Sequence, residues 1–243
     1  MSVASSAPAG QPARPIVVIT GAAGNLGRAV AAHFAAAGGV TALFDRSEDS
    51  LQRAFGPESA AQTLVAADLL DQAAVDAAVA RVVQRHGRID VLCNLAGGFR
   101  MGEPVHETGA DTWNLLLDLN ARSIVHMAHA VVPRMLANGG GRIVNVAANG
   151  ARHGSAGMGA YAVSKSAVQR LTEAMAAELR ERGIGVNCVL PSTLDTPENR
   201  RAMPDADPAR WVAPADLAAV IGFLASPAAR AVHGASLPVV GLS

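Results

Sequence analysis

The chain of 243 residues is poor in aromatic side chains, in cysteine and in excess charge of either sign. Aromatic residues make up 3% of it, so aliphatic side chains must build most of the core. Its 20 basic and 20 acidic residues cancel, which argues against nucleic acid or an anionic membrane surface as a partner. No apolar run approaches the roughly 20 residues that a membrane-spanning helix needs. A chain of this size and composition is expected to form one compact domain.

The N-terminal stretch 1–15 is small and polar, and it lacks the apolar core of a secretory signal. It is predicted to be a disordered leader of a cytoplasmic protein. Cys93 and Cys188 each lie in an apolar run, which favours buried, reduced thiols over a disulfide. His126 and His129 are three residues apart without a third ligand in register, so no metal site is predicted.

Short apolar runs alternate with longer alanine-rich segments of helical pattern. The predicted strands are 16–20, 40–44, 63–67, 90–94, 142–146, 185–190 and 236–240. The predicted helices are 26–37, 71–85, 111–137, 160–182 and 215–224, with a weaker one at 47–55. Because the strands are apolar throughout, they indicate a parallel sheet covered on both faces. Right-handed crossovers then give a single-domain α/β protein with a doubly wound Rossmann fold, a seven-stranded parallel sheet flanked by helices.

The first predicted strand runs into the sequence TGAAGNLG, residues 20–27, which leads directly into a helix. Gly21, Gly24 and Gly27 would let the backbone turn tightly and approach a pyrophosphate at the N-terminus of that helix. A glycine triplet alone is also consistent with a plain strand-to-helix turn. The strand before it, the helix after it and an acid at the end of the second strand favour dinucleotide binding.

The acid is Asp45, whose carboxylate can accept hydrogen bonds from both ribose hydroxyls while repelling a 2′-phosphate. It predicts NAD, with NADH preferred over NADPH. Arg46 weakens this prediction, because a guanidinium could pair with a phosphate, so NADP stays open. Asp68 ends the third strand and either meets the adenine or caps the helix that follows.

The segment YAVSK, residues 161–165, places a phenol and an ammonium four residues apart on one helical face. A nearby fixed cation favours the phenolate. Lys165 is therefore expected to lower the pKa of Tyr161 by roughly one to three units. Tyr161 is the only tyrosine of the chain. The alternative is a surface pair without a role, since this spacing also arises by chance.

Taken together, these motifs resemble the short-chain dehydrogenase/reductase family over essentially 16–240. They occur in the family's order: TGAAGNLG, Asp45, Asp68, NLAG at 94–97, Asn120, YAVSK, and NCVLPSTLDT at 187–196. The resemblance implies that Tyr161 transfers a proton, Lys165 holds the nicotinamide ribose and lowers the phenol pKa, and Asn120 helps carry a proton relay through water. Residues 16–243 would then be a dinucleotide-binding oxidoreductase domain, with 191–214, which lacks clear periodicity, as its substrate lid.

The positions expected to contact the cofactor follow from these matches. They are Gly21, Gly24, Asn25, Leu26, Gly27, Asp45, Arg46, Asp68, Leu69, Asn94, Ala96, Gly97, Tyr161, Lys165, Pro191, Thr193 and Thr196.

Two departures from the family pattern point to one of its branches. The serine expected thirteen positions before the tyrosine is Ala148, and Asn25 and Leu95 replace a glycine and an asparagine. The dihydropteridine reductase branch resembles the chain in these features and in VLPSTLDTPENRRAMPDAD at 189–207. This resemblance implies NADH-dependent reduction of a quinonoid dihydropterin or a similar conjugated C=N/C=O acceptor, with Tyr161 as proton donor.

Other possibilities remain open at the level of the sequence. Ala148, Asn149, Ser155 and Met158 are the candidate substrate contacts, and Asn149, His153 or Ser155 could replace the missing hydroxyl. The function could instead be that of an ordinary alcohol/carbonyl oxidoreductase, or of an NAD(H)-sensing protein without catalysis. The expected partners are a small-molecule substrate and further copies of the chain, as a homodimer or homotetramer.

Overall fold

A computed structural model describes residues 14–243, so that residues 1–13 of the predicted leader lie outside the described residues. Seven parallel strands form one sheet in the order β3-β2-β1-β4-β5-β6-β7. The strands are β1 Ile16–Thr20, β2 Val40–Asp45, β3 Gln62–Ala66, β4 Val91–Asn94, β5 Gly141–Val146, β6 Ile184–Pro191 and β7 Ser236–Val239. The predicted doubly wound parallel sheet is thereby confirmed, with strand ends displaced by no more than a residue or so.

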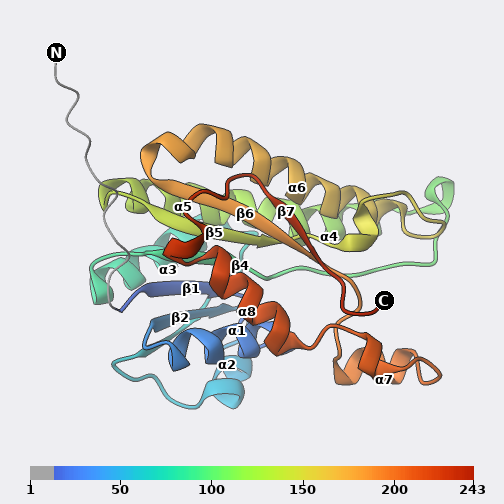
Figure 1. Ribbon diagram of the computed structural model, residues 1–243, viewed down its shortest axis with the longest axis horizontal. Coiled ribbons are helices and arrows are strands. Elements are labelled where there is room, and N and C mark those ends of the chain that lie inside the picture. Colours follow the sequence, from blue (N-terminus) through green and yellow to red (C-terminus); the bar gives the residue numbers. More distant parts are fainter. Residues whose placement is uncertain (1–13) are drawn as a thin grey trace.

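The two faces of the sheet bury separate sets of aliphatic side chains under two layers of helices (Figure 1). The helices are α1 Asn25–Ala36, α2 Glu48–Phe55, α3 Gln72–His86, α4 Ala110–Leu117, α5 Ser123–Ala137, α6 Gly159–Leu179, α7 Pro197–Ala202 and α8 Pro214–Leu224. Val18 of β1 packs with side chains of α3, α5 and α6, whereas Val17 packs with those of α1, α2 and α8. Strand residues of either parity are therefore buried, which explains the uninterrupted apolar runs.

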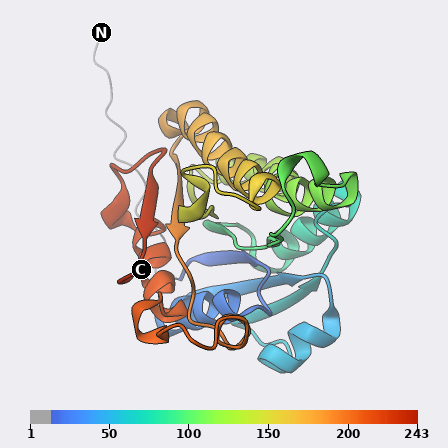
Figure 2. The same cartoon turned by 90° about the vertical axis from the view of Figure 1, so that its right-hand side faces the viewer.

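The order of the strands reverses at β1, which pairs with β2 on one side and with β4 on the other. In open sheets of this type the crevice beyond the carboxyl ends of such a strand pair accommodates ligands. In Figure 1, α7 and the loop between β4 and α4 lie at the same end of the molecule, and Figure 2 views that end. The candidate residues therefore have to be sought there.

The helix predicted at 111–137 is confirmed, since the chain is helical from Ala110 to Ala137, but the geometry of its middle was not predicted. A π-helical turn, Asp118–Arg122, separates α4 from α5. A π turn adds a residue to the helix and rotates the side chains that follow it, and it often marks a functional position. Apolar periodicity did not reveal it, because both flanking helices bury apolar side chains on the same layer.

Two other predicted segments also differ from the structure. The predicted helix 160–182 corresponds to α6, which ends at Leu179 and continues as a 3₁₀ turn, Arg180–Arg182. The segment 191–214 contains the short helix α7, which Thr196 caps by accepting a hydrogen bond from the Asn199 amide.

Both cysteines are buried and free, as predicted. Over residues 14–243, no helix is long and apolar enough to cross a membrane.

Candidate active site

The glycine-rich turn brings the end of β1 against the start of α1 and leaves no room for side chains. Gly21 has φ +63°, and a Cβ there would lie 2.9 Å from the Cα of Ala96. A side chain on Gly27 would overlap the carbonyl oxygens of Gly21 and Ala22. Gly24 is the N-cap of α1 and provides no side-chain cap, and the first turn holds no acidic residue. The amides of Ala22, Ala23 and Gly24 are engaged within the protein, whereas those of the first turn of α1 are open to an anionic group such as a pyrophosphate.

Asp45 stands at the end of β2 with its carboxylate against the same turn. Its two oxygens accept hydrogen bonds from the backbone amides of Ala23 and Arg46, at 3.1 and 2.8 Å. These bonds orient a half-buried negative charge beside the glycine-rich turn. The predicted dinucleotide residues Gly21, Gly24, Gly27 and Asp45 are therefore brought together, while the Arg46 side chain is exposed.

Asp68 was predicted either to meet the adenine or to cap the next helix, and its hydrogen bonds argue against the cap. Its carboxylate accepts a hydrogen bond from the Leu70 amide at 2.9 Å, whereas Asp71 caps α3. Asp68 therefore shapes the loop after β3 and does not cap the helix. Leu69 packs against the core, and its carbonyl lies 2.8 Å from Nδ1 of His126.

The side chain of Asn94 is buried in the interior. Its side-chain amide donates to Oδ1 of Asn145 at 2.8 Å, and Asn145 in turn donates to Oγ1 of Thr172 at 2.9 Å. All three side chains are buried. Asn94 thus ties β4 to β5 and α6, and only its backbone is left to face the crevice.

The segment after β4 is drawn toward both β1 and the π turn. The amides of Leu95 and Ala96 donate to Oγ1 of Thr20, at 3.0 and 3.2 Å. A Cβ on Gly97 would lie 2.6 Å from Oδ1 of Asn120 and 3.1 Å from Nζ of Lys165. Only glycine lets this backbone pass so close to the two candidate catalytic side chains.

Asn120 occupies the middle of the π turn and is fully buried. Its side chain accepts from the Gly98 amide at 2.8 Å and donates to the Gly98 carbonyl at 3.0 Å and to Oγ of Ser164 at 2.9 Å. Ser164 donates in turn to the carbonyl of Tyr161 at 2.8 Å. Asn120 thereby positions both the loop after β4 and the helix that carries Tyr161. Sequence reasoning missed Ser164, although it lies within the YAVSK motif.

Tyr161 lies in the first turn of α6, and its ring meets Phe99 edge to face with ring centroids 4.8 Å apart. Burial raises the pKa of Tyr161 to about 12. The sequence predicts a shift in the opposite direction, from the charge of Lys165, so this expectation is wrong for the structure. The cause is desolvation of the phenol by burial. Phe99 was also missed, because nothing in its local sequence distinguishes it from other loop residues.

Lys165 is buried, and its Nζ donates to the carbonyl of Val146 at the end of β5, at 2.9 Å. Burial lowers the pKa of Lys165 to about 8. A lysine of this kind is partly neutral near physiological pH and acts less strongly as a fixed cation than the sequence suggests.

The residues expected to contact substrate surround the start of α6. Ala148 is buried at the position of the expected serine and offers no hydroxyl. Beside it, the side-chain oxygen Oδ1 of Asn149 is buried and has no hydrogen-bond partner among the described residues. Met158 immediately precedes α6, whereas Ser155 is exposed in the loop before it. Asn149 is therefore the stronger candidate for a polar substrate contact.

The segment that begins at Pro191 reaches across to the glycine-rich turn. The Nδ2 of Asn25 donates to Oε2 of Glu198 in α7 at 2.7 Å, a contact between residues 173 positions apart. The carbonyl of Thr193 accepts from the Val212 amide at 2.9 Å, which ties the two ends of the segment together. Thr196 caps α7, so its side-chain oxygen is already engaged as an acceptor. Glu198 was not predicted, since only the folded chain brings it to α1.

Within residues 14–243 no group of three histidine, cysteine or acidic side chains has the geometry of a metal site. His126 instead joins α5 to the loop after β3 through the carbonyl of Leu69. The candidate site consists of the glycine-rich turn, Asp45 beside it, and Tyr161 with the buried Lys165 on α6.

Known proteins match this chain over most of its length. A family model described as short chain dehydrogenase matches residues 15–207. D-Threitol dehydrogenase of Mycolicibacterium smegmatis is 34% identical over 238 residues, covering 93% of this chain and 91% of that enzyme. 2-Dehydro-3-deoxy-L-rhamnonate dehydrogenase (NAD(+)) of Sphingomonas sp. is 36% identical over 189 residues, covering 78% and 76%. The crystal structure of 3-ketoacyl-(acyl-carrier-protein) reductase from Brucella melitensis complexed with NADH has a TM-score of 0.85 at 30% identity, covering 93% and 97%.

Proposed function

Because the chain belongs to the short-chain dehydrogenase/reductase family, we propose that it is an NADH-dependent reductase of a conjugated C=N or C=O acceptor, such as a quinonoid dihydropterin. The observation that carries this proposal is the buried Ala148 beside an intact pair of Tyr161 and Lys165. A conjugated acceptor spreads developing negative charge over several heteroatoms. It therefore depends less on a hydrogen bond from one hydroxyl group than an isolated ketone does. The resemblance of the sequence at 189–207 to the dihydropteridine reductase branch is a second reason for proposing this acceptor.

The cofactor residues fit a dinucleotide. The open amides at the start of α1 would hold the pyrophosphate, and Asp45 would hold the adenosine ribose. The carboxylate favours NAD(H) over the 2′-phosphorylated form by charge. When bound, the nicotinamide supplies the hydride. Lys165 and the glycine backbone at position 97 lie together where the nicotinamide ribose would be held.

Tyr161 would supply the proton. Its pKa of about 12 keeps the phenol protonated at neutral pH, which suits donation to a reduced product. Asn120 and Ser164 would keep the first turn of α6 in place while the proton leaves. Lys165 would stabilise the phenolate that remains.

A second candidate is an ordinary alcohol or polyol oxidoreductase, which the names of the related dehydrogenases favour. In that case the unpaired Oδ1 of Asn149 would accept a hydrogen bond from a substrate hydroxyl. A third candidate is an NAD(H)-sensing protein without catalysis. The intact pair of Tyr161 and Lys165 argues against it, whereas tight NADH binding without turnover of any acceptor would favour it.

The test is oxidation of NADH with quinonoid dihydropterin, simple ketones and imines as acceptors. Wild type is expected to turn over the dihydropterin fastest, and Tyr161→Phe to lose about 100-fold or more in kcat while NADH affinity stays unchanged. Ala148→Ser is the matched variant for the missing hydroxyl, and it should raise ketone reduction more than dihydropterin reduction. Equal rates for wild type and Tyr161→Phe would remove Tyr161 as the proton donor, and faster turnover of alcohols would favour the second candidate.

A further inference from the structure

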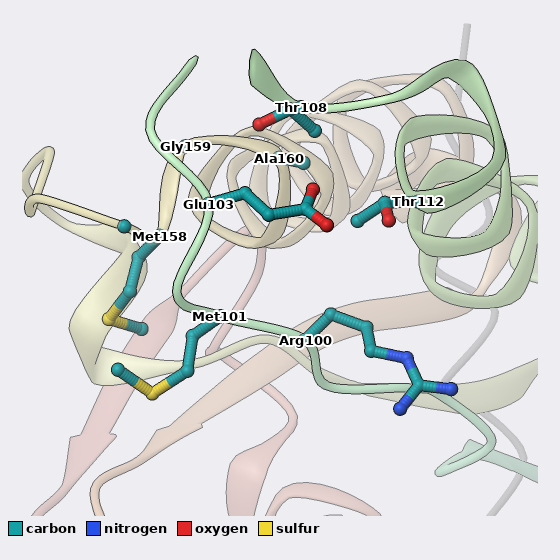
Figure 3. A pocket seen from close by; sticks show the side chains of 9 residues that line it. Arg100, Met101, Glu103, Thr108, Thr112, Met158, Gly159 and Ala160 are labelled. Carbon is teal, nitrogen blue, oxygen red and sulfur yellow. The ribbon is translucent and has the colours of Figure 1, made fainter. Parts of the chain in front are cut away.

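A hollow of about 60 Å³ lies between the loop after β4, the start of α4 and the start of α6 (Figure 3). Its lining consists of Arg100, Met101, Glu103, Thr108, Thr112, Gly157, Met158, Gly159 and Ala160. The volume has room for several water molecules, or for one end of a small substrate. Of these residues, only Met158 was predicted from the sequence to contact substrate.

Besides the guanidinium of Arg100, the polar side chains of the hollow are the carboxylate of Glu103 and the hydroxyls of Thr108 and Thr112. In Figure 3 the carboxylate of Glu103 lies toward Thr108 and Thr112, while the guanidinium of Arg100 extends in another direction. Oγ1 of Thr108 donates its proton to the carbonyl of Pro104 at 3.1 Å, so its oxygen is left to accept. Over residues 14–243, no hydrogen bond or ion pair engages the Glu103 carboxylate. A free carboxylate beside a hydroxyl oxygen selects groups that donate hydrogen bonds.

The two walls of the hollow belong to chain segments that also carry residues of the Tyr161 site. Arg100 follows Phe99, whose ring contacts the ring of Tyr161, and Ala160 directly precedes Tyr161 in α6. The amide of Gly102 donates to the carbonyl of Gly157 at 2.8 Å, which holds the two walls together. Along both segments, the hollow thus borders the residues that surround Tyr161.

We propose that Glu103, flanked by the hydroxyls of Thr108 and Thr112, forms a subsite for a substrate group with two neighbouring hydrogen-bond donors. The amino group and ring N–H of a 2-amino-4-oxopyrimidine ring offer such a pair, and so do the adjacent hydroxyls of a polyol. A carboxylate accepts both hydrogens of a pair through its two oxygens. The methionines Met101 and Met158 on the other side would contact a flat ring or a carbon chain. This subsite rests on the proposed function, since it belongs to the same substrate.

The test measures binding first, so that it does not depend on turnover. Calorimetric titrations of the protein with NADH present use 2-amino-4-oxopteridine in one arm and threitol in the other. For the ligand that occupies the subsite, Glu103→Gln is expected to weaken binding about tenfold or more and Thr112→Val several-fold, as for loss of a charged hydrogen bond. Glu107→Gln, which removes an exposed carboxylate four residues away, is the matched control and should leave the affinity unchanged.

Steady-state kinetics supply the second measurement. In Glu103→Gln, the KM of an acceptor that carries the donor pair is expected to rise at least tenfold relative to that of an acceptor without N–H or O–H groups, while kcat falls much less. The arm in which binding depends on Glu103 identifies the ring or the polyol as the ligand. Unchanged affinity for both ligands in Glu103→Gln would overturn the subsite. Absence of turnover by wild type, with Glu103-dependent binding retained, would instead overturn the proposed reaction alone.

Discussion

At the scale of single residues, burial pushes Tyr161 and Lys165 toward their neutral forms. The pKa of the phenol rises to about 12 and that of the ammonium falls to about 8, because each charged form loses water on folding. A phenol with a raised pKa stays protonated at neutral pH, which is the form that a proton donor needs. The tyrosine is thus prepared to donate, and the i, i+4 spacing alone does not reveal this.

The lowered pKa of Lys165 predicts a pH dependence of stability. Between pH 8 and pH 10 the unfolded chain keeps this lysine protonated while the folded protein releases the proton, so unfolding binds a proton and stability rises with pH. Over this window wild type should gain about 2 kcal/mol in unfolding free energy relative to Lys165→Met.

Urea unfolding of both proteins at several pH values measures this difference. Taking the difference cancels the titration of the cysteines and Tyr161, which are the same in both chains. If the difference in unfolding free energy between the two proteins stayed constant from pH 8 to pH 10, Lys165 would keep its ordinary pKa in the folded protein.

At the scale of elements, the π turn between α4 and α5 connects parts of the site that are distant in the chain. Asn120 bonds Gly98 after β4 and Ser164 on α6 at the same time. The strands and most helices were predictable, because apolar runs and helical periodicity depend on near neighbours. The π turn was not, because the partners that stabilise its extra residue come from other elements.

Asn120→Ala is therefore expected to destabilise the protein by about 2 to 3 kcal/mol, since it leaves the buried Gly98 amide and Ser164 hydroxyl without their partner. Asn114→Ala on the exposed face of α4 is the matched control, because it makes the same change in helix propensity without loss of a buried bond. Chemical denaturation measures both variants. If both variants lost the same free energy of unfolding, the hydrogen bonds of Asn120 would contribute nothing measurable to stability.

At the scale of the whole molecule, α4, α5 and α6 present exposed apolar side chains on the surface. These are Trp113, Leu115, Val125 and Val163. Val125 and Val163 keep 48% and 46% of their surface exposed, and exposed apolar side chains on these helices suit a contact between copies of the chain. A homodimer or homotetramer built on these helices stays a prediction.

Light scattering after size exclusion is expected to give two or four times the mass of the chain. Val125→Glu should lower the observed mass or shift it to higher protein concentration, because a carboxylate would be buried without a partner. Gln52→Glu on the exposed face of α2 adds the same charge elsewhere and should leave the mass unchanged. A monomeric wild type would contradict the prediction.

The sequence by itself determined the seven strands, the glycine-rich turn with Asp45, and the spacing of Tyr161 and Lys165, because these follow from patterns among residues near in the chain. Only the tertiary structure decided the direction of the Tyr161 pKa shift and the partners of Asn120. It alone also brought Glu198 to Asn25 and Glu103 to Thr112. Burial and hydrogen-bond partners come from segments far apart in the chain, so no local pattern specifies them.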